Sequence, residues 1–191
     1  MNTEMLNALK EKAHKWAVGH GFYEEVKPDA FYLGLVMSEA GEAINADRKG
    51  RHADTKRFEE VMAMRSISPR AAFEENIKDS VEDEIADIVI RLLDFAGLKG
   101  YKVIVDLSDP SVLFYLVFFE NFWLPGMLFH LMGALSDAFD DGYVEGCIAC
   151  LIGIFEGCFG KMTGSDKDLW WFVEQKMRYN DLRPRLNGKK Y

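Results

Sequence analysis

Two pairs of carboxylates are the residues of this chain best suited to do chemistry. Glu39 and Glu42 form one pair and Glu84 and Asp87 the other, each spaced i, i+3. On a helix this spacing places both carboxylates on one face. If the two helices pack face to face, four acidic side chains converge, and their repulsion and desolvation favour a bound cation. Oxygen ligands without a nearby His or Cys select a hard ion, Mg²⁺ or else Mn²⁺.

A solvated helix face is the alternative for either pair, because acidic residues at i, i+3 are common on exposed helices. Apolar residues surround both pairs, however: Leu33, Leu35, Val36, Met37, Ala40, Ala43 and Ile44 near the first, and Ile85, Ile88, Val89, Leu92 and Leu93 near the second. Helices this apolar are largely buried. We therefore expect the carboxylates at the edge of a helical core.

Helical periodicity predicts the elements that position these residues. We expect an all-α fold with helices at 3–18, 29–48, 79–98, 111–121, 125–140, 144–160 and 166–182, and shorter helical pieces at 54–64 and 69–77. Only 101–107 has the pattern of a short strand. The whole chain, 1–191, is expected to form one domain, made of an active helical half (29–100), a second half (110–165) and a basic C-terminal helix and tail (166–191).

The second half repeats the apolar frame of the first. Residues 33–43 align with 128–138, and 82–87 align with 145–150. Glu39, Glu42, Glu84 and Asp87 then correspond, in that order, to Ala134, Asp137, Cys147 and Cys150. The second copy therefore keeps the frame and loses most of the ligands. This pattern predicts a pseudo-symmetric four-helix bundle with a degenerate half, although so few identities could also arise by chance.

Composition restricts the classes of partner. The net charge of −8 argues against binding to duplex nucleic acid. The longest apolar segment, 112–135, is interrupted by Glu120, Pro125 and His130, which indicates two buried helices rather than a membrane span. There is no secretory signal pattern at the N-terminus, and three clustered cysteines indicate reduced thiols in a cytoplasmic protein.

The order Glu-x-x-Glu and then Glu-x-x-Asp, on consecutive apolar helices, resembles the MazG-like all-α nucleoside triphosphate pyrophosphohydrolases. The stretch 81–94 is similar to that family's second-motif helix, and Lys176, Asn180 and Arg183 before a Gly-Lys tail that includes Lys189 resemble the family's C-terminus. The resemblance covers 29–98 and 166–191. The interval of 41 residues between Glu42 and Glu84 is longer than is usual in the family, so we expect 50–78 to be an inserted lid or loop.

The resemblance implies a Mg²⁺-dependent hydrolase that converts an NTP or dNTP to the monophosphate and pyrophosphate. The resemblance implies that the metal ligands and catalytic groups are Glu39, Glu42, Glu84 and Asp87, with Glu39 also a candidate general base. It implies that the triphosphate is bound by Lys176, Asn180, Arg183 and Lys189. The basic residues could instead simply favour a helix C-terminus. Two alternative functions remain: a non-catalytic nucleotide-binding or regulatory module and a purely structural helical protein. A homodimeric state is also open, because the shortest family members associate to complete the bundle.

Overall fold

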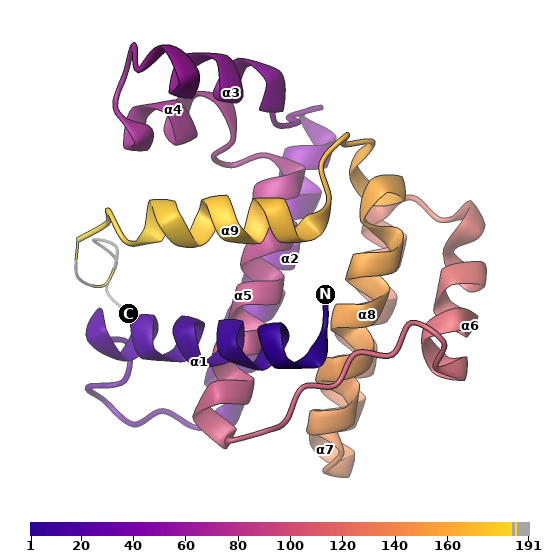
Figure 1. Ribbon diagram of the computed structural model, residues 1–191. Helices are drawn as coiled ribbons and strands as arrows, with labels where there is room; N and C mark the ends of the chain where they lie inside the picture. Colours follow the sequence, from indigo (N-terminus) through magenta and orange to yellow (C-terminus); the bar gives the residue numbers. More distant parts are fainter. Residues whose placement is uncertain (185, 187–191) are drawn as a thin grey trace.

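The expected all-α fold is confirmed over residues 1–184 and 186, the part of the chain that the computed structural model describes (Figure 1). The elements are α1 (Thr3–Gly19), α2 (Asp29–Arg48), α3 (Thr55–Met64), α4 (Pro69–Asn76), α5 (Val81–Lys99), α6 (Pro110–Phe118), the 3₁₀ turn η1 (Phe119–Asn121), α7 (Leu124–Asp141), α8 (Val144–Thr163) and α9 (Leu169–Asn180). Their bounds lie within a few residues of those expected from periodicity.

Helix α5 forms the centre of the fold. Its N-terminus is capped by Ser80, whose side chain accepts a hydrogen bond from the Asp83 N–H, and it ends at Gly100, which has a left-handed φ of 69°. Helices α1, α2, α8 and α9 all pack against it, and Figure 1 shows α1 and α9 crossing it on one side. Because it is enclosed, α5 carries its acidic first turn into the interior: Glu82, Asp83 and Glu84 are all buried.

The second helical hairpin packs beside the first. Helix α7 contacts both α2 and α8, and α8 also contacts α5. One continuous set of buried apolar side chains runs through all four helices. The two acid-bearing helices, α2 and α5, are thus supported along their length by a second pair, α7 and α8.

The prediction of a strand at 101–107 is wrong. The segment has an extended backbone, but the structure described here contains no strand in it or beside it. The Asn7 side chain on α1 takes the place of a neighbouring strand. Its Oδ1 accepts a hydrogen bond from the Val103 N–H (3.1 Å), and its Nδ2 donates to the Val103 carbonyl (2.7 Å). A single amide thus satisfies both backbone groups of Val103, and the Lys10 ammonium and Glu145 carboxylate bond the backbone of Tyr101 and Lys102.

The segment 50–78 contains a helical pair, α3 and α4, that is attached to α9. The Phe73 ring of α4 stacks on Tyr179 with centroids 4.4 Å apart, and the Tyr179 hydroxyl donates to Glu74 (3.0 Å). At the other end, Thr55 donates to Asp166 just before α9 (3.0 Å). Both ends of the pair are therefore fixed to the body of the protein.

Helix α8 is the one described helix that is long and apolar enough to cross a bilayer by length and composition. More than half of that stretch is buried inside the protein, as it is in core helices of soluble proteins. The apolar segment 112–135 forms α6, η1 and part of α7, with a break before α7.

Candidate metal centre and adjoining pocket

Three of the four predicted ligands meet between α2 and α5. One carboxylate oxygen each of Glu39, Glu42 and Glu84 lies within 4.8 Å of the other two. Glu39 and Glu84 are each only 4% exposed, whereas Glu42 is exposed. The cluster therefore lies at the rim of the core, as the surrounding apolar residues predicted, with one carboxylate open to solvent.

The fourth predicted ligand, Asp87, lies beside a lysine. Its Oδ2 is 2.7 Å from Lys176 Nζ, and the same ammonium donates to Asp83 Oδ1, also at 2.7 Å. Lys176 is buried at 4% exposed, and Asp83 also accepts a hydrogen bond from the Asp79 N–H. Lys176 was expected to bind triphosphate, but here it neutralises two carboxylates of the neighbouring helix.

Two carboxylates of the cluster, Glu39 and Glu84, hold protons more tightly than ordinary glutamates. Burial, followed by the charges of Asp83 and Asp87, raises the pKa of Glu84 to about 9. Burial and the charge of Asp87 also raise the pKa of Glu39, although Arg91 opposes this. Ionising two such carboxyl groups together is unfavourable, and it becomes favourable once a bound cation compensates their charge. Three oxygen donors within 4.8 Å of one another fit a hard divalent ion.

A second charged row on α5 was not predicted from the sequence. Asp87, Arg91 and Asp94 are spaced i, i+4, i+7, and the Arg91 guanidinium donates to Glu39 across the interface with α2. Asp94 lies 2.9 Å from His14 Nδ1 on α1. The row therefore connects the acid cluster to α1. The i, i+4, i+7 spacing on a largely apolar helix was the signal that could have revealed it.

A pocket of about 230 Å³ begins where the acid cluster ends. Its wall includes Glu39 and Asp87 as well as the row's Arg91 and Asp94. Much of the rest is aromatic and comes from α1, the loop after it and the start of α2: Trp16, Phe22, Tyr23, Phe31 and Tyr32. The pocket thus joins a charged end to an aromatic end.

The polar atoms of this pocket are incompletely satisfied. Trp16 Nε1 and Asn180 Oδ1 are buried and have no hydrogen-bond partner in the described part of the chain. The Tyr23 hydroxyl is also buried but lies beside Asp94; burial, the Asp94 charge and a hydrogen bond to that carboxylate raise the pKa of Tyr23. Buried polar groups are nearly always paired in folded proteins. Two unpartnered polar atoms in one pocket leave hydrogen-bonding positions that a polar ligand could fill.

The residues predicted to bind triphosphate divide into three groups. Asn180 and Arg183 line the pocket with Glu39. Lys176 is engaged by Asp83 and Asp87, as described above. Lys189 lies outside the described residues. Since α9 ends at Asn180, Arg183 follows in a turn, where its N–H donates to the Asn180 carbonyl (3.0 Å).

The counterpart positions in the second half also meet at one place. Ala134, Asp137, Cys147 and Cys150 all line a cavity of about 530 Å³, and the Cys147 thiol lies 3.6 Å from the Ala134 carbonyl oxygen. Burial raises the pKa of Cys147 to about 12 and raises that of Cys150 as well. Both thiols are therefore neutral, as small core residues would be, rather than metal-binding thiolates.

No family model, curated protein or solved structure matches the chain. The functional argument therefore depends on the acid cluster and the pocket beside it.

Proposed function

We propose that this protein is a Mg²⁺-dependent nucleoside triphosphate pyrophosphohydrolase. One observation carries the proposal: Glu39 belongs both to the three-carboxylate cluster and to the wall of the aromatic pocket. A ligand with a planar, polar end and a polyanionic end would fill the pocket and still reach the cluster, and a nucleotide has both ends. An acidic protein can bind such a polyanion when a metal ion offsets the negative charge.

The roles of the residues follow from their positions. Glu39, Glu42 and Glu84 would hold the ion, which would polarise phosphate oxygens and lower the pKa of a bound water. Glu39, with its raised pKa, would accept the proton from the water that attacks the α-phosphorus, and Arg91 would keep this carboxylate in place. Arg183 would offset charge on the triphosphate, and Trp16 and Asn180 would satisfy their orphaned atoms with polar groups of the base or sugar.

We also infer that the hairpins α2–α5 and α7–α8 are copies of one unit in a MazG-like bundle. The support is the cavity between α7 and α8, which gathers the four positions that align with the acidic motif. A hairpin that has lost its ligands would still cover the apolar face of the active one, and so would take the place of a second subunit.

The test is pyrophosphate release from a panel of NTPs and dNTPs, with and without Mg²⁺. We expect Mg²⁺-dependent release from at least one substrate. Glu84→Gln should reduce it by at least about 100-fold, since loss of a transition-state electrostatic interaction is worth several kcal/mol. Glu75→Gln, on the exposed face of α4, is the matched control and should leave the rate unchanged.

The non-catalytic alternative rests on the Lys176–Asp87 pair, which leaves three carboxylates rather than four for the metal. A nucleotide-binding module would bind Mg²⁺ and nucleotide and release no pyrophosphate from any member of the panel. Equal pyrophosphate release with and without Mg²⁺ would exclude both proposals.

A further inference from the structure

The net formal charge of the protein can be assigned to one continuous segment of the chain. Residues 103–160 contain 8 of the 31 acidic residues and none of the 23 lysines and arginines. The 23 acidic residues elsewhere balance those 23 cations, so the net charge of −8 belongs to this segment alone. The segment spans α6, η1, α7 and most of α8, which lie on one side of the molecule in Figure 1.

The acidic side chains of this segment are available to a partner. Seven of the eight are exposed: Asp106, Asp109, Glu120, Asp137, Asp140, Asp141 and Glu145. None of these seven forms an ion pair within the described part of the chain; Glu156, the eighth, pairs with the N-terminal ammonium (2.7 Å). Unpaired carboxylates gathered on one side give a surface a lasting negative potential.

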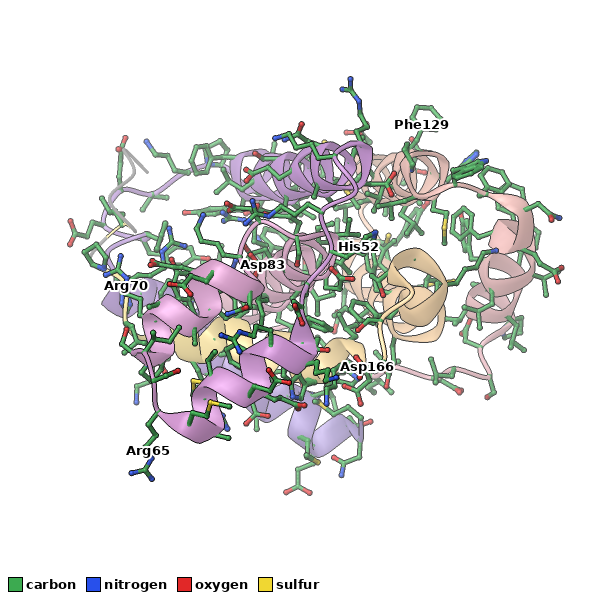
Figure 2. The ribbon with its side chains drawn as sticks, turned by 90° about the horizontal axis from the view of Figure 1, so that it is seen from above. His52, Arg65, Arg70, Asp83, Phe129 and Asp166 are labelled. Atoms are coloured by element: carbon green, nitrogen blue, oxygen red, sulfur yellow. The ribbon has the colours of Figure 1, made fainter. Side chains whose placement is uncertain are left out.

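An exposed row of aromatic rings lies on the same side. This aromatic ridge comprises the exposed Phe114, Phe118, Trp123 and Phe129 and the half-buried Phe122; Trp123 is 85% exposed and Phe129 73% exposed. Four of these rings are contiguous. The Phe118 ring centroid lies 5.5 Å from that of Phe114 and 4.8 Å from that of Phe122, and the His130 ring connects Phe118 to Phe129 with centroid distances of 5.2 and 5.5 Å. Figure 2 shows Phe129 projecting outward from α7. Contiguous exposed apolar surface of this kind marks an interaction site.

A groove runs beside the ridge. It is the 530 Å³ cavity described above, and its floor includes Gly133 and Ala134 of α7 and Gly146 of α8. A Cβ added at Gly133 or Gly146 would meet nothing within 4 Å, so the floor is open. Tyr115, Phe129 and Tyr143 form its sides, and Asp137 lies at its edge. Asp109 is close enough for its charge to raise the pKa of Cys150 in the groove.

We propose that the groove and the aromatic ridge bind a basic amphipathic helix of a partner protein. Apolar side chains of such a helix would fill the groove, as in other helix-in-groove complexes. Its lysines and arginines would meet Asp109 and Asp137 and lie over the exposed ring faces, which attract cations. This proposal uses the degenerate half of the fold and does not depend on the proposed catalytic function.

An exposed apolar face could be covered by another protein, by a second copy of the chain or by a membrane, and charge complementarity favours the first. A second copy of the chain would bring an equally acidic surface against this one, and like charges across an interface cost several kcal/mol. An anionic bilayer attracts surfaces rich in lysine and arginine, and this surface has neither. A basic polypeptide is the occupant whose charge complements the surface.

The test uses two fluorescein-labelled helical peptides of about 18 residues, one a Leu/Lys amphipathic helix and the other its Leu/Glu isomer. Fluorescence anisotropy should show binding of the Leu/Lys peptide, weakening with salt, and none of the Leu/Glu peptide. Gly133→Leu fills the groove from an open position on a helix and should weaken binding at least tenfold. The double variant Asp109→Asn, Asp137→Asn should do the same. Gly34→Leu, also at an open helical glycine, is the control and should bind as the wild type does.

Three outcomes would overturn the proposal. Unchanged affinity in Gly133→Leu, with the native circular dichroism spectrum retained, would show that the peptide binds elsewhere. Concentration-dependent dimerisation of the wild type that Gly133→Leu abolishes would assign the face to a second copy. Binding to phosphatidylcholine/phosphatidylglycerol vesicles that the same variant abolishes would assign it to a membrane surface.

Discussion

Lys176 of α9 places its ammonium 2.7 Å from Asp87 of α5, one helical turn from Glu84 of the acid cluster. The lysine is buried together with Asp83, which it also contacts. It therefore stabilises a group of carboxylates that would otherwise repel one another in a poorly solvated place. The candidate site is thus held together by an internal cation even before a metal binds.

Replacing Lys176 with Met should strongly destabilise the protein. The substitution keeps the length of the side chain but leaves Asp83 buried without its partner, which costs about 3–5 kcal/mol. Urea unfolding at pH 7 would measure the change. Lys99→Met, which removes an exposed pair with Asp29, is the control and should cost far less, because solvent screens that pair. Equal losses in the two variants would show that Lys176 does not neutralise the cluster.

The protein without metal should lose stability as the pH rises through neutrality. Burial raises the pKa of Glu84 from 4.5 to about 9, so the folded state holds a proton that the unfolded state releases above about pH 4.5. The contribution of Glu84 is complete below pH 4.5 and falls with a slope of up to about 1.4 kcal/mol per pH unit until pH 9. Urea unfolding in EDTA from pH 5 to 8.5 would measure this slope.

Glu84→Gln should flatten that pH dependence, because glutamine does not ionise. At pH 8 in EDTA the variant should be more stable than the wild type, since the folded wild type must hold a proton or bear an unfavourable charge there. An unchanged slope would contradict the proton assignment. Glu75→Gln, at an exposed site, should keep the slope of the wild type.

Binding of Mg²⁺ at pH 7 should release protons. The carboxyl of Glu84 is protonated at this pH and must ionise to bind the ion, so about one proton or more should leave per site. Calorimetry in two buffers of different ionisation enthalpy would count the protons. The count should fall in Glu84→Gln and stay the same in Glu75→Gln. Mg²⁺ binding without proton release would mean that the ion binds elsewhere.

Gly97→Ala should destabilise the contact between α1 and α5. A Cβ at this position would lie 2.5 Å from the Cβ of His14, so the two helices would have to separate. Overpacking of this kind costs about 1–3 kcal/mol. Gly34→Ala, at an open helical position, should instead stabilise by about 0.5–1 kcal/mol. Thermal unfolding would measure both, and a stabilised Gly97→Ala would show that α1 packs differently.

Periodicity was sufficient to predict the helices and to place Glu39 with Glu42 and Glu84 with Asp87 on one helix face each, because i, i+3 spacing is a local property of a sequence. The packing of α2 against α5 then brings Glu39, Glu42 and Glu84 together. Periodicity failed at 101–107, where the partner of the extended backbone is the Asn7 side chain, far away in the chain. It also failed at the end of α9. There Pro184 disfavours a helical Arg183, a signal that the expected helix at 166–182 did not take into account.

The pocket could not be predicted in the same way. Trp16 and Tyr23 are far in sequence from both acidic motifs, and their apolar surroundings are equally compatible with simple core positions. Only the packing of α1 against α5 shows that Trp16 Nε1 is left without a partner and that Tyr23 lies beside Asp94. The role of Lys176 was missed for a similar reason, because helical spacing gives the face of a residue but not the partner across the interface.

The confinement of the net charge to residues 103–160 also gives the molecule a permanent electric dipole. Its negative end lies at α6–α8, while the aromatic pocket lies among α1, α2 and the end of α9 (Figure 1). Diffusing anions are repelled from the α6–α8 side before any contact forms, and cations are drawn to it. The range of this field shortens as salt is added, so the charge asymmetry acts on distant molecules mainly at low ionic strength.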